Sequence, residues 1–257
     1  IEGDTSAGNV GLRDTIDYSA ISNTYYLDAD LSSNTLVIKQ TSDSTSVDSD
    51  TVNNIEDIVG TAGKDIIRGN DSKNILSGAE GTDTIYGEAG NDVIYGGNNT
   101  DNSTTATTYE LLDGGAGDDT IYGGAGNDSI LGGSDAGLDT LYGEAGNDII
   151  EGGSGVDTID GGTGDDTIKG DSGEDLIYGG LGADTIRGGS EADIIHGGDS
   201  LNSSTDGDDI IYGEDGTDTI YGGYGNDTIN GGANNDTIYG GIIGNTDYDN
   251  PIYGNAD

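Results

Sequence analysis

A nine-residue repeat runs through most of this chain and constrains its fold more than any other feature of the sequence. From Gly60 to Tyr239 the chain reads Gly-Gly-x-Gly-x-Asp-x-apolar-x in 18 consecutive units. Clear copies are residues 87–95 (GEAGNDVIY), 123–131 (GGAGNDSIL) and 222–230 (GGYGNDTIN). Position one is Gly and position eight is Ile or Leu in all 18 units, and position six is Asp in 16 of them. A fixed period of this kind is typical of solenoids, in which each unit stacks on its neighbours.

The residue types within one unit predict a tight turn followed by a short strand. Gly at positions one, two and four supplies backbone angles that other residues reach only with strain. Position five is often Asn or Asp, the residues that best tolerate left-handed geometry, so we expect it to share this turn. The last three positions often read Thr-Ile-Tyr, and strand alternation points the middle side chain inward. Two units then make one turn of a flattened coil with a thin core of Ile and Leu.

Three units carry insertions, which predict loops at the edges of the coil. The units that begin at Gly96, Gly132 and Gly197 exceed the period by nine, two and seven residues. In each unit the extra residues precede the acid position and leave the following apolar position intact. Insertions that avoid the strand half of the unit are compatible with a continuous solenoid.

The composition excludes several classes of function. The chain has 50 Asp or Glu and only seven Lys or Arg, and its formal charge of −43 repels nucleic acid and anionic membrane surfaces. It has no Cys and one His, His196, which excludes thiolate and His-rich metal sites. His196 falls on an outward position nine, so we expect a surface residue. No apolar run approaches the ~18 residues that a spanning helix needs. We therefore expect no enzyme, no nucleic-acid partner and no membrane insertion.

The acids of the repeat predict a need for cations. Low hydrophobicity with high net charge is typical of chains that stay disordered in water. Units two apart should stack their acids at the strand spacing of ~4.8 Å, where like charges repel strongly. Ca²⁺ relieves this repulsion best, because it accepts carboxylates and carbonyls in irregular geometry, whereas Mg²⁺ demands a tighter octahedron. The expected columns contain Asp128, Asp148, Asp166 and Asp184 on one edge, and Asp119, Asp139, Asp157 and Asp175 on the other.

The repeat resembles the RTX (repeat-in-toxin) calcium-binding nonapeptide, and the resemblance covers residues 60–253. It implies an all-β fold, a right-handed parallel β-roll. It also implies that the position-six Asp supplies a carboxylate, that carbonyls of positions one, three and five complete the shell, and that each ion lies between units n and n+2. Nine units on each edge then allow roughly 16 calcium ions. The implied metal ligands are Asp65, Asp83, Asp92, Asp119, Asp128, Asp139, Asp148, Asp157, Asp166, Asp175, Asp184, Asp193, Asp209, Asp218, Asp227 and Asp236.

Four of the residues that depart from this pattern predict weak or empty sites. Asn74 and Glu110 replace Asp at position six, and Glu191 and Asn234 replace Gly at position four. The acid pairs, such as Asp118 with Asp119, imitate catalytic dyads. Because they fall on turn positions five and six, we interpret them as calcium-site residues.

Residues 1–59 differ from the roll of residues 60–257, and we expect them to form a β-rich N-terminal cap. Residues 8–17 resemble one decayed repeat, and residues 24–31 and 35–40 are predicted strands joined by a turn. Residues 41–50 are polar and predicted to form a loop. A cap is expected because a solenoid needs a terminal unit that covers its open end. The chain begins and ends within repeat-like sequence, so we expect a segment of a longer protein.

Two outward columns leave alternatives open. Tyr95, Tyr122 and Tyr142 should stack at position nine, which fits cross-strand packing better than a glycan-binding surface, and glycans stay a weaker candidate partner. Outward Thr at position seven could form an ice-binding array, but Leu176 and Ile194 interrupt it, so ordinary strand propensity is the better interpretation.

The sequence therefore predicts a calcium-dependent extracellular structural module of a bacterial surface protein, such as an adhesin, an S-layer subunit or a fibre. The resemblance implies type I secretion of an unfolded chain that calcium folds outside the cell. The alternative is a folding and secretion module of an exported enzyme or toxin whose active domain lies outside this chain. Since an open solenoid end is an unpaired edge, end-to-end self-association into filaments is also expected.

Overall fold

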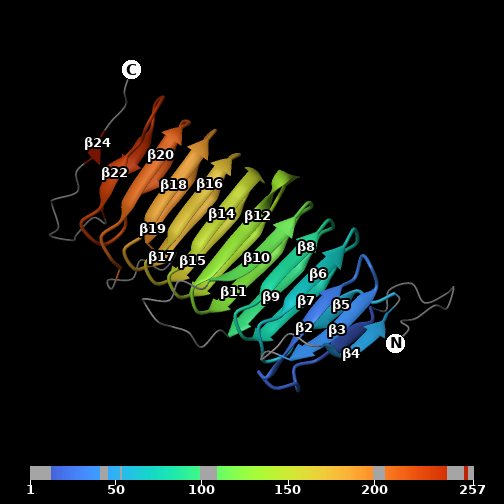
Figure 1. The fold of residues 1–257 in the computed structure, drawn as a ribbon. Coiled ribbons are helices and arrows are strands. Elements are labelled where there is room, and N and C mark those ends of the chain that lie inside the picture. Colours follow the sequence, from blue (N-terminus) through green and yellow to red (C-terminus); the bar gives the residue numbers. More distant parts are fainter. Residues whose placement is uncertain are drawn as a thin grey trace.

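The chain folds into a parallel β-solenoid. The computed structural model describes residues 13–40, 46–52, 54–98, 109–198, 206–241 and 252–253. The regular secondary structure of these residues consists of β-strands alone. The strands follow one another along a single axis from the N-terminal to the C-terminal end (Figure 1). No helix among these residues could cross a membrane. The predicted all-β parallel architecture is confirmed.

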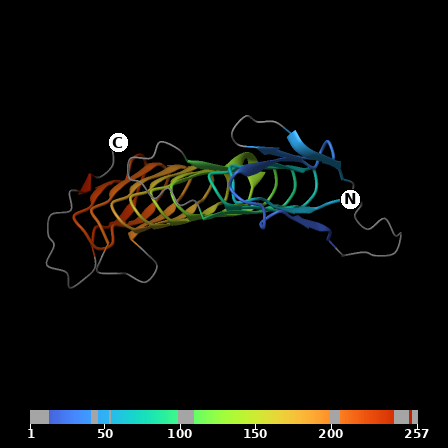
Figure 2. The same ribbon diagram turned by 60° about the horizontal axis from the view of Figure 1, so that its bottom comes forward.

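Within the described residues the strands form two sheets, which face each other as two layers joined by turns (Figure 2). The first sheet has 11 strands: β1 (Thr15–Asp17), β5 (Asp57–Val59), β7 (Ile75–Glu80), β9 (Val93–Asn98), β11 (Thr120–Ala125), β13 (Thr140–Ala145), β15 (Thr158–Thr163), β17 (Leu176–Leu181), β19 (Ile194–Gly198), β21 (Thr219–Tyr221) and β23 (Thr237–Tyr239). The second has 13: β4 (Ser46–Thr51), β3 (Thr35–Gln40), β2 (Tyr25–Asp30), β6 (Ile66–Asn70), β8 (Thr84–Glu88), β10 (Glu110–Gly115), β12 (Asp128–Gly137), β14 (Ile149–Gly155), β16 (Thr167–Ser172), β18 (Thr185–Ser190), β20 (Ile210–Asp215), β22 (Thr228–Asn230) and β24 (Ile252–Tyr253).

Strands pair with the repeat two units away, so equivalent positions lie side by side. Ile121 pairs with Leu141 in the first sheet, and Ile168 pairs with Ile186 in the second. The position-eight side chains fill the space between the sheets, and from Ile67 to Ile229 all of them are fully buried. The predicted thin core of one apolar residue per repeat is confirmed.

The turns use left-handed backbone angles at two positions, which favour glycine, and need glycine at a third position for space. In one unit Gly162 and Gly164, at positions two and four, have φ of 99° and 130°. Non-glycine residues at these positions adopt the same region, for example Glu88 at 75° and Glu191 at 77°. Position one does not enter this region in the described repeats. Its glycine is required by a close approach of oxygen atoms, described below.

Position five has a different role from the predicted one. Its Asn and Asp residues do not occupy the left-handed region in the described repeats, so that prediction is wrong. Their side chains instead hydrogen-bond along the axis. The Asn147 Oδ1 accepts a bond from the backbone N–H of Asp165 at 3.2 Å, and the Asp165 Oδ1 accepts one from Ala183 at 3.0 Å. This row of side-chain hydrogen bonds along the axis favours short side chains with an oxygen acceptor.

The two outer faces differ in chemistry. On the first sheet, position nine carries stacked rings: Tyr95 and Tyr122 have centroids 5.1 Å apart, and Tyr122 and Tyr142 4.9 Å. On the second sheet the same position mixes charged residues, such as Lys169 and Arg187, with tyrosines, such as Tyr212. The Arg187 guanidinium lies 4.6 Å from the ring of Tyr212 and pairs with Glu214 at 2.5 Å. The predicted tyrosine column is therefore confirmed on one sheet.

The N-terminal segment extends both sheets. β2 and β3 form the predicted antiparallel hairpin, with Leu27 paired to Ile38. Residues 46–50 belong to β4, which pairs antiparallel with the open edge of β3, so the predicted loop is wrong there. A polar sequence can form an edge strand, because pairing with the neighbouring strand uses backbone N–H and C=O groups, which every residue but proline provides. Residues 41–45 of that prediction lie outside the described residues.

The parallel register reaches further toward the N-terminus than the recognisable repeats. Ile16 of β1 pairs with Ile58 of β5, which pairs with Leu76 of the second repeat. Asn54 has φ of 56°, as expected for position four of a unit over residues 51–59. β1 also holds the C-terminal part of the predicted decayed repeat in register; residues 8–12 lie outside the described residues. The predicted boundary between residues 59 and 60 stays a prediction.

Candidate metal centre

The position-six acids line the inside of the turns in two columns. Each acid lies where a turn becomes a strand. It is two residues before the buried position eight, so its side chain points into the coil as well. Of the 16 Asp residues predicted as ligands, Asp236 is half-buried and the others are at most 2% exposed. These are Asp65, Asp83, Asp92, Asp119, Asp128, Asp139, Asp148, Asp157, Asp166, Asp175, Asp184, Asp193, Asp209, Asp218 and Asp227.

One oxygen of each carboxylate is held by the backbone. The Oδ1 of Asp148 accepts a bond from the N–H of Asp128, two repeats earlier, at 2.8 Å, and the same bond recurs along both columns at 2.7–3.1 Å. The predicted stacking of Asp128, Asp148, Asp166 and Asp184 in one column is confirmed by these bonds.

The second oxygen has no protein donor in most repeats. Buried Oδ2 atoms without a hydrogen-bond partner belong to Asp83, Asp92, Asp119, Asp148, Asp157, Asp166, Asp175, Asp184, Asp193, Asp209, Asp218 and Asp236. A buried, half-satisfied carboxylate is costly in its charged form. Burial accordingly raises the pKa of Asp148 to about 9, of Asp166 to about 8 and of Asp157 to about 6, with charge repulsion from neighbouring acids as a further cause.

A cradle of oxygens surrounds each orphan atom. A Cβ built on Gly152, at position one, would lie 2.8 Å from the Asp157 Oδ2 and 2.8 Å from the carbonyl oxygen of Gly170, two repeats later. Glycine therefore leaves open a space into which a carboxylate and a carbonyl both point. The same arrangement recurs at most of the other position-one glycines, for example Gly123 with Asp128 and Gly143.

The donor set fits a hard cation. No three His, Cys, Asp or Glu side chains among the described residues converge on one point, so a bound ion must draw on carbonyl oxygens as well as a carboxylate. Mixed carboxylate and carbonyl ligands suit Ca²⁺. A calcium ion in this cradle would supply the positive charge that the orphan oxygen lacks. The structure places the position-one carbonyls there; a ligand role for positions three and five stays a prediction.

The four residues predicted to mark weak or empty sites keep the geometry of the repeat. Glu191 and Asn234 adopt the left-handed region at position four, with φ of 77° and 73°. Glu110 stays in its column and is 1% exposed. Asn74 is fully buried, and its Nδ2 donates a hydrogen bond to the carbonyl of Glu56 at 2.7 Å.

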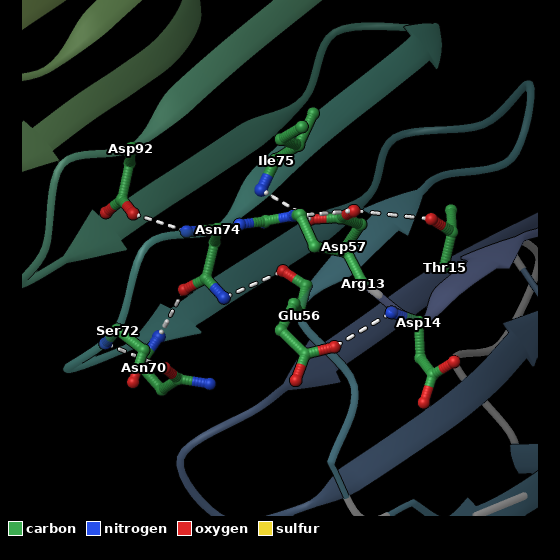
Figure 3. Close-up of polar contacts among 10 residues, drawn as sticks. All are labelled: Arg13, Asp14, Thr15, Glu56, Asp57, Asn70, Ser72, Asn74, Ile75 and Asp92. Carbon is green, nitrogen blue, oxygen red and sulfur yellow. Dashed lines mark hydrogen bonds and ion pairs between the residues drawn. The ribbon is translucent and has the colours of Figure 1, made fainter. Parts of the chain in front are cut away.

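Glu56 is a position-six residue that the sequence analysis missed. Its Oε2 accepts a bond from the backbone N–H of Asp14 at 2.9 Å, as position-six acids do further along (Figure 3). The unit lacks the marker glycines, with Thr51 at position one. Counting nine residues back from Asp65 and Ile67 would have found Glu56 and Ile58.

The remaining candidate residues lie apart from the columns. Asp118 is exposed and accepts a bond from the N–H of Leu138 at 3.0 Å, whereas Asp119 points into the coil, so the two carboxylates have different surroundings. His196 stacks between Tyr178 and Tyr221, with centroid distances of 4.8 and 4.6 Å. Burial lowers the pKa of His196, which favours its neutral form.

Comparison with known proteins agrees with this geometry. No curated protein matches the chain. The family model for the RTX calcium-binding nonapeptide repeat, which describes four copies, matches residues 50–85, 69–102, 110–138, 134–168, 151–186, 169–200, 203–223 and 212–242. The matches together span more than half of the chain, and the repeats of this family bind calcium. This chain therefore belongs to the RTX calcium-binding nonapeptide repeat family.

Proposed function

We propose that this chain is a calcium-dependent extracellular structural module of a bacterial surface protein, such as an adhesin, an S-layer subunit or a fibre. It leaves the cell unfolded by type I secretion and folds where calcium is abundant. Its role is structural rather than catalytic. The position-six Asp residues bind the ions, of which there are roughly 16.

The observation that carries this proposal is the pair of buried acid columns. Most of the described repeats take a carboxylate out of water and leave its Oδ2 without a donor, for example in Asp148 and Asp166. With a formal charge of −43, the chain has few cations of its own to neutralise these groups. Ions that bind only the folded state shift the equilibrium toward it, so calcium concentration decides whether the module is folded.

Far-UV circular dichroism of EDTA-stripped protein during a calcium titration tests the proposal, with magnesium as the control ion. We expect a cooperative change from coil to β structure near millimolar calcium and no such change with magnesium at the same concentration. A stripped protein that is already fully β-structured and indifferent to calcium would overturn the proposal.

End-to-end association is part of the proposed structural role. β23 is the last described strand of the first sheet and has a described partner on one side only, β21. An edge of this kind supports pairing with a further strand of the same or another chain. Sedimentation velocity at saturating calcium over a range of protein concentrations measures such association. A sedimentation coefficient that is independent of concentration would count against filaments.

A further inference from the structure

The first two repeats differ from the later ones in how they satisfy their position-six side chain. In the first repeat, Thr61 donates two hydrogen bonds to Asp65: its backbone N–H to Oδ2 at 2.5 Å and its hydroxyl to Oδ1 at 2.8 Å. The backbone N–H of Leu27, from the β2–β3 hairpin, donates a third hydrogen bond to Oδ1 at 2.6 Å. Asp65 is therefore saturated with protein donors, whereas the Oδ2 of Asp83 in the third repeat has none.

The second repeat reaches the same result with a neutral side chain. The Asn74 Oδ1 accepts a bond from the backbone N–H of Asn70 at 2.9 Å, and its Nδ2 donates to the carbonyl of Glu56 at 2.7 Å (Figure 3). An amide N–H directed at a carbonyl occupies a place where a cation and its oxygen ligands would otherwise meet. This repeat needs no added positive charge.

The backbone angle at position two separates the first two repeats from the two that follow them. Thr61 and Asn70 stay outside the left-handed region, and their N–H groups point into the turn toward position six. In the third and fourth repeats the equivalent residues, Ala79 and Glu88, have φ of 77° and 75°. The orphan Oδ2 atoms begin with these repeats, at Asp83 and Asp92. A backbone N–H at hydrogen-bond distance from the carboxylate places a positive hydrogen where calcium would have to bind.

The segment before the repeats neutralises one of its own buried acids with an arginine. The Arg13 guanidinium forms an ion pair with the Asp57 carboxylate, and its Nε lies 3.1 Å from both carboxylate oxygens (Figure 3). The Asp57 Oδ1 also accepts a bond from the N–H of Ile75 in the second repeat at 2.9 Å. An arginine of the chain thus neutralises Asp57, the buried position-seven acid next to Glu56.

We infer that calcium binding begins at the third repeat, and that residues 60–77 together with β1 to β5 form a cap that folds without calcium. This inference rests on the proposed function and removes Asp65 from its calcium ligands, because it divides the chain into a metal-free cap and a calcium-dependent array. The cap presents ordered strands β6 and β7 on which the third and fourth repeats pair. Calcium-driven folding then starts from a preformed template at the N-terminal end.

Hydrogen–deuterium exchange of the whole chain, in EDTA and at saturating calcium, tests the cap. In EDTA we expect slow amide exchange in peptides from residues 25–31 and 57–77, and fast exchange in peptides from residues 110–195. Calcium should protect the second group and change the first little. Fast exchange of both groups in EDTA, with protection of both appearing together on calcium addition, would overturn the inference.

Matched substitutions test the ion assignment by counting bound calcium with equilibrium dialysis. Asp166→Asn should lose at least one ion, whereas Asp65→Asn should lose none, although it weakens the cap. Equal losses in both variants would show that Asp65 is a ligand. A chain that binds no calcium at all would end the proposed function, while the exchange result in EDTA would still decide whether the cap folds alone.

Asn74→Asp is a second test, because it should make this repeat require calcium. The new carboxylate would face the Glu56 carbonyl without a donor between them, so the cap should lose its protection in EDTA and regain it with calcium. Unchanged protection in EDTA would show that the amide contact is not what makes this repeat independent of calcium.

Discussion

At the scale of single residues, the two oxygens of one carboxylate have separate tasks. In Asp166, Oδ1 accepts the N–H of Asp148 at 2.7 Å and sets the spacing between turns, while Oδ2 has no protein donor. The first bond is available to the chain alone, and the second oxygen requires a cation. One side chain therefore both holds the turns together and creates the need for a cation. A substitution can keep the hydrogen bond of Oδ1 and still remove the charge of Oδ2.

Asp166→Asn should raise the calcium concentration at the midpoint of folding by about tenfold, which corresponds to ~1.4 kcal/mol. The amide keeps an oxygen for the N–H of Asp148 but loses the charged ligand. Asp165→Asn is the matched control, because it removes the same charge from an exposed neighbour that keeps its acceptor for Ala183. Calcium titrations followed by circular dichroism measure both midpoints. Equal shifts in the two variants would mean that only net charge matters.

Acid should partly replace calcium. Burial raises the pKa of Asp148 and Asp209 to about 9 and of Asp184 to about 7, above the ~3.9 of an unfolded Asp. A raised folded-state pKa means that protonation stabilises the fold. This stabilisation is complete below the unfolded pKa and is lost as pH rises through about 7 to 9. In EDTA, β structure measured by circular dichroism should therefore increase from pH 8 to pH 5. A signal that stays at the coil value throughout this range would contradict the prediction.

Residue-scale prediction from the sequence succeeded where one physical cause acts. Position eight is apolar because it is buried, and every such residue from Ile67 to Ile229 is buried. Position five was misjudged because Asn and Asp suit both left-handed turns and hydrogen-bond ladders, and composition does not separate these causes. Glu56 was missed because its unit lacks glycine, although its spacing from Asp65 is that of the repeat.

At the scale of elements, each turn is closed by glycine and each strand is reinforced by its outward neighbours. The position-one glycine stands beside two oxygens that converge on its open side, as Gly152 does beside Asp157 and Gly170. The position-nine rings stack on one another along the first sheet, so their faces contact other rings and mainly their edges meet water. This stacking supports the cross-strand-packing interpretation of the tyrosines.

Gly152→Ala should destabilise the calcium-loaded roll by about 1–3 kcal/mol and lower its calcium occupancy. The methyl group would lie 2.8 Å from the Gly170 carbonyl, which belongs to the backbone and cannot rotate away. Val156→Ala, in the same turn but 53% exposed, is the control and should have little effect. Thermal unfolding at saturating calcium gives the comparison. If Gly152→Ala unfolds at the same temperature as the unsubstituted chain, the close approach has no energetic role.

Tyr122→Ala should lower stability by about 1 kcal/mol, because it removes the central ring of three. Tyr122→Phe keeps the ring and should retain most of the stability, which separates stacking from the hydroxyl. Thermal unfolding reports this difference, and a glycan array probed with the same two variants tests the weaker alternative. Specific glycan binding that is lost in Tyr122→Ala at unchanged stability would favour a recognition surface over packing.

At the scale of the whole molecule, repulsion decides whether the chain is compact. The chain carries a formal charge of −43, and its repeats bring carboxylates into two buried columns. The period predicted the two-sheet coil from the sequence, because identical units can only stack in one register. The cap was harder to predict, since β4 is polar and is ordered by the free edge of β3 rather than by its own sequence. Partner elements of this kind leave no periodic signal.

Calcium should shrink the chain in a way that monovalent salt cannot reproduce. Scaling relations give a radius of gyration of about 56 Å for an unfolded chain of this length and about 18 Å for a compact one, and an elongated roll should lie somewhat above the latter. Small-angle X-ray scattering measures the change. Even at about 1 M, potassium chloride should leave the protein expanded, because salt screens exposed charges far better than buried ones. Full compaction by potassium chloride would show that surface repulsion alone opposes folding.

Because successive repeats lie on opposite sheets, it matters whether the roll gains or loses an even or an odd number of repeats. Gain or loss of two adjacent units, 18 residues, changes the molecule by one complete turn and returns every later side chain to its own sheet. Loss of a single unit would move all later residues to the opposite sheet. The stacked Tyr221 and Tyr239 would then follow Lys169 and Arg187 in the position-nine column of the second sheet. Duplications and deletions in such genes should therefore be tolerated in even numbers, and the unit of inheritance is the pair rather than the nonapeptide.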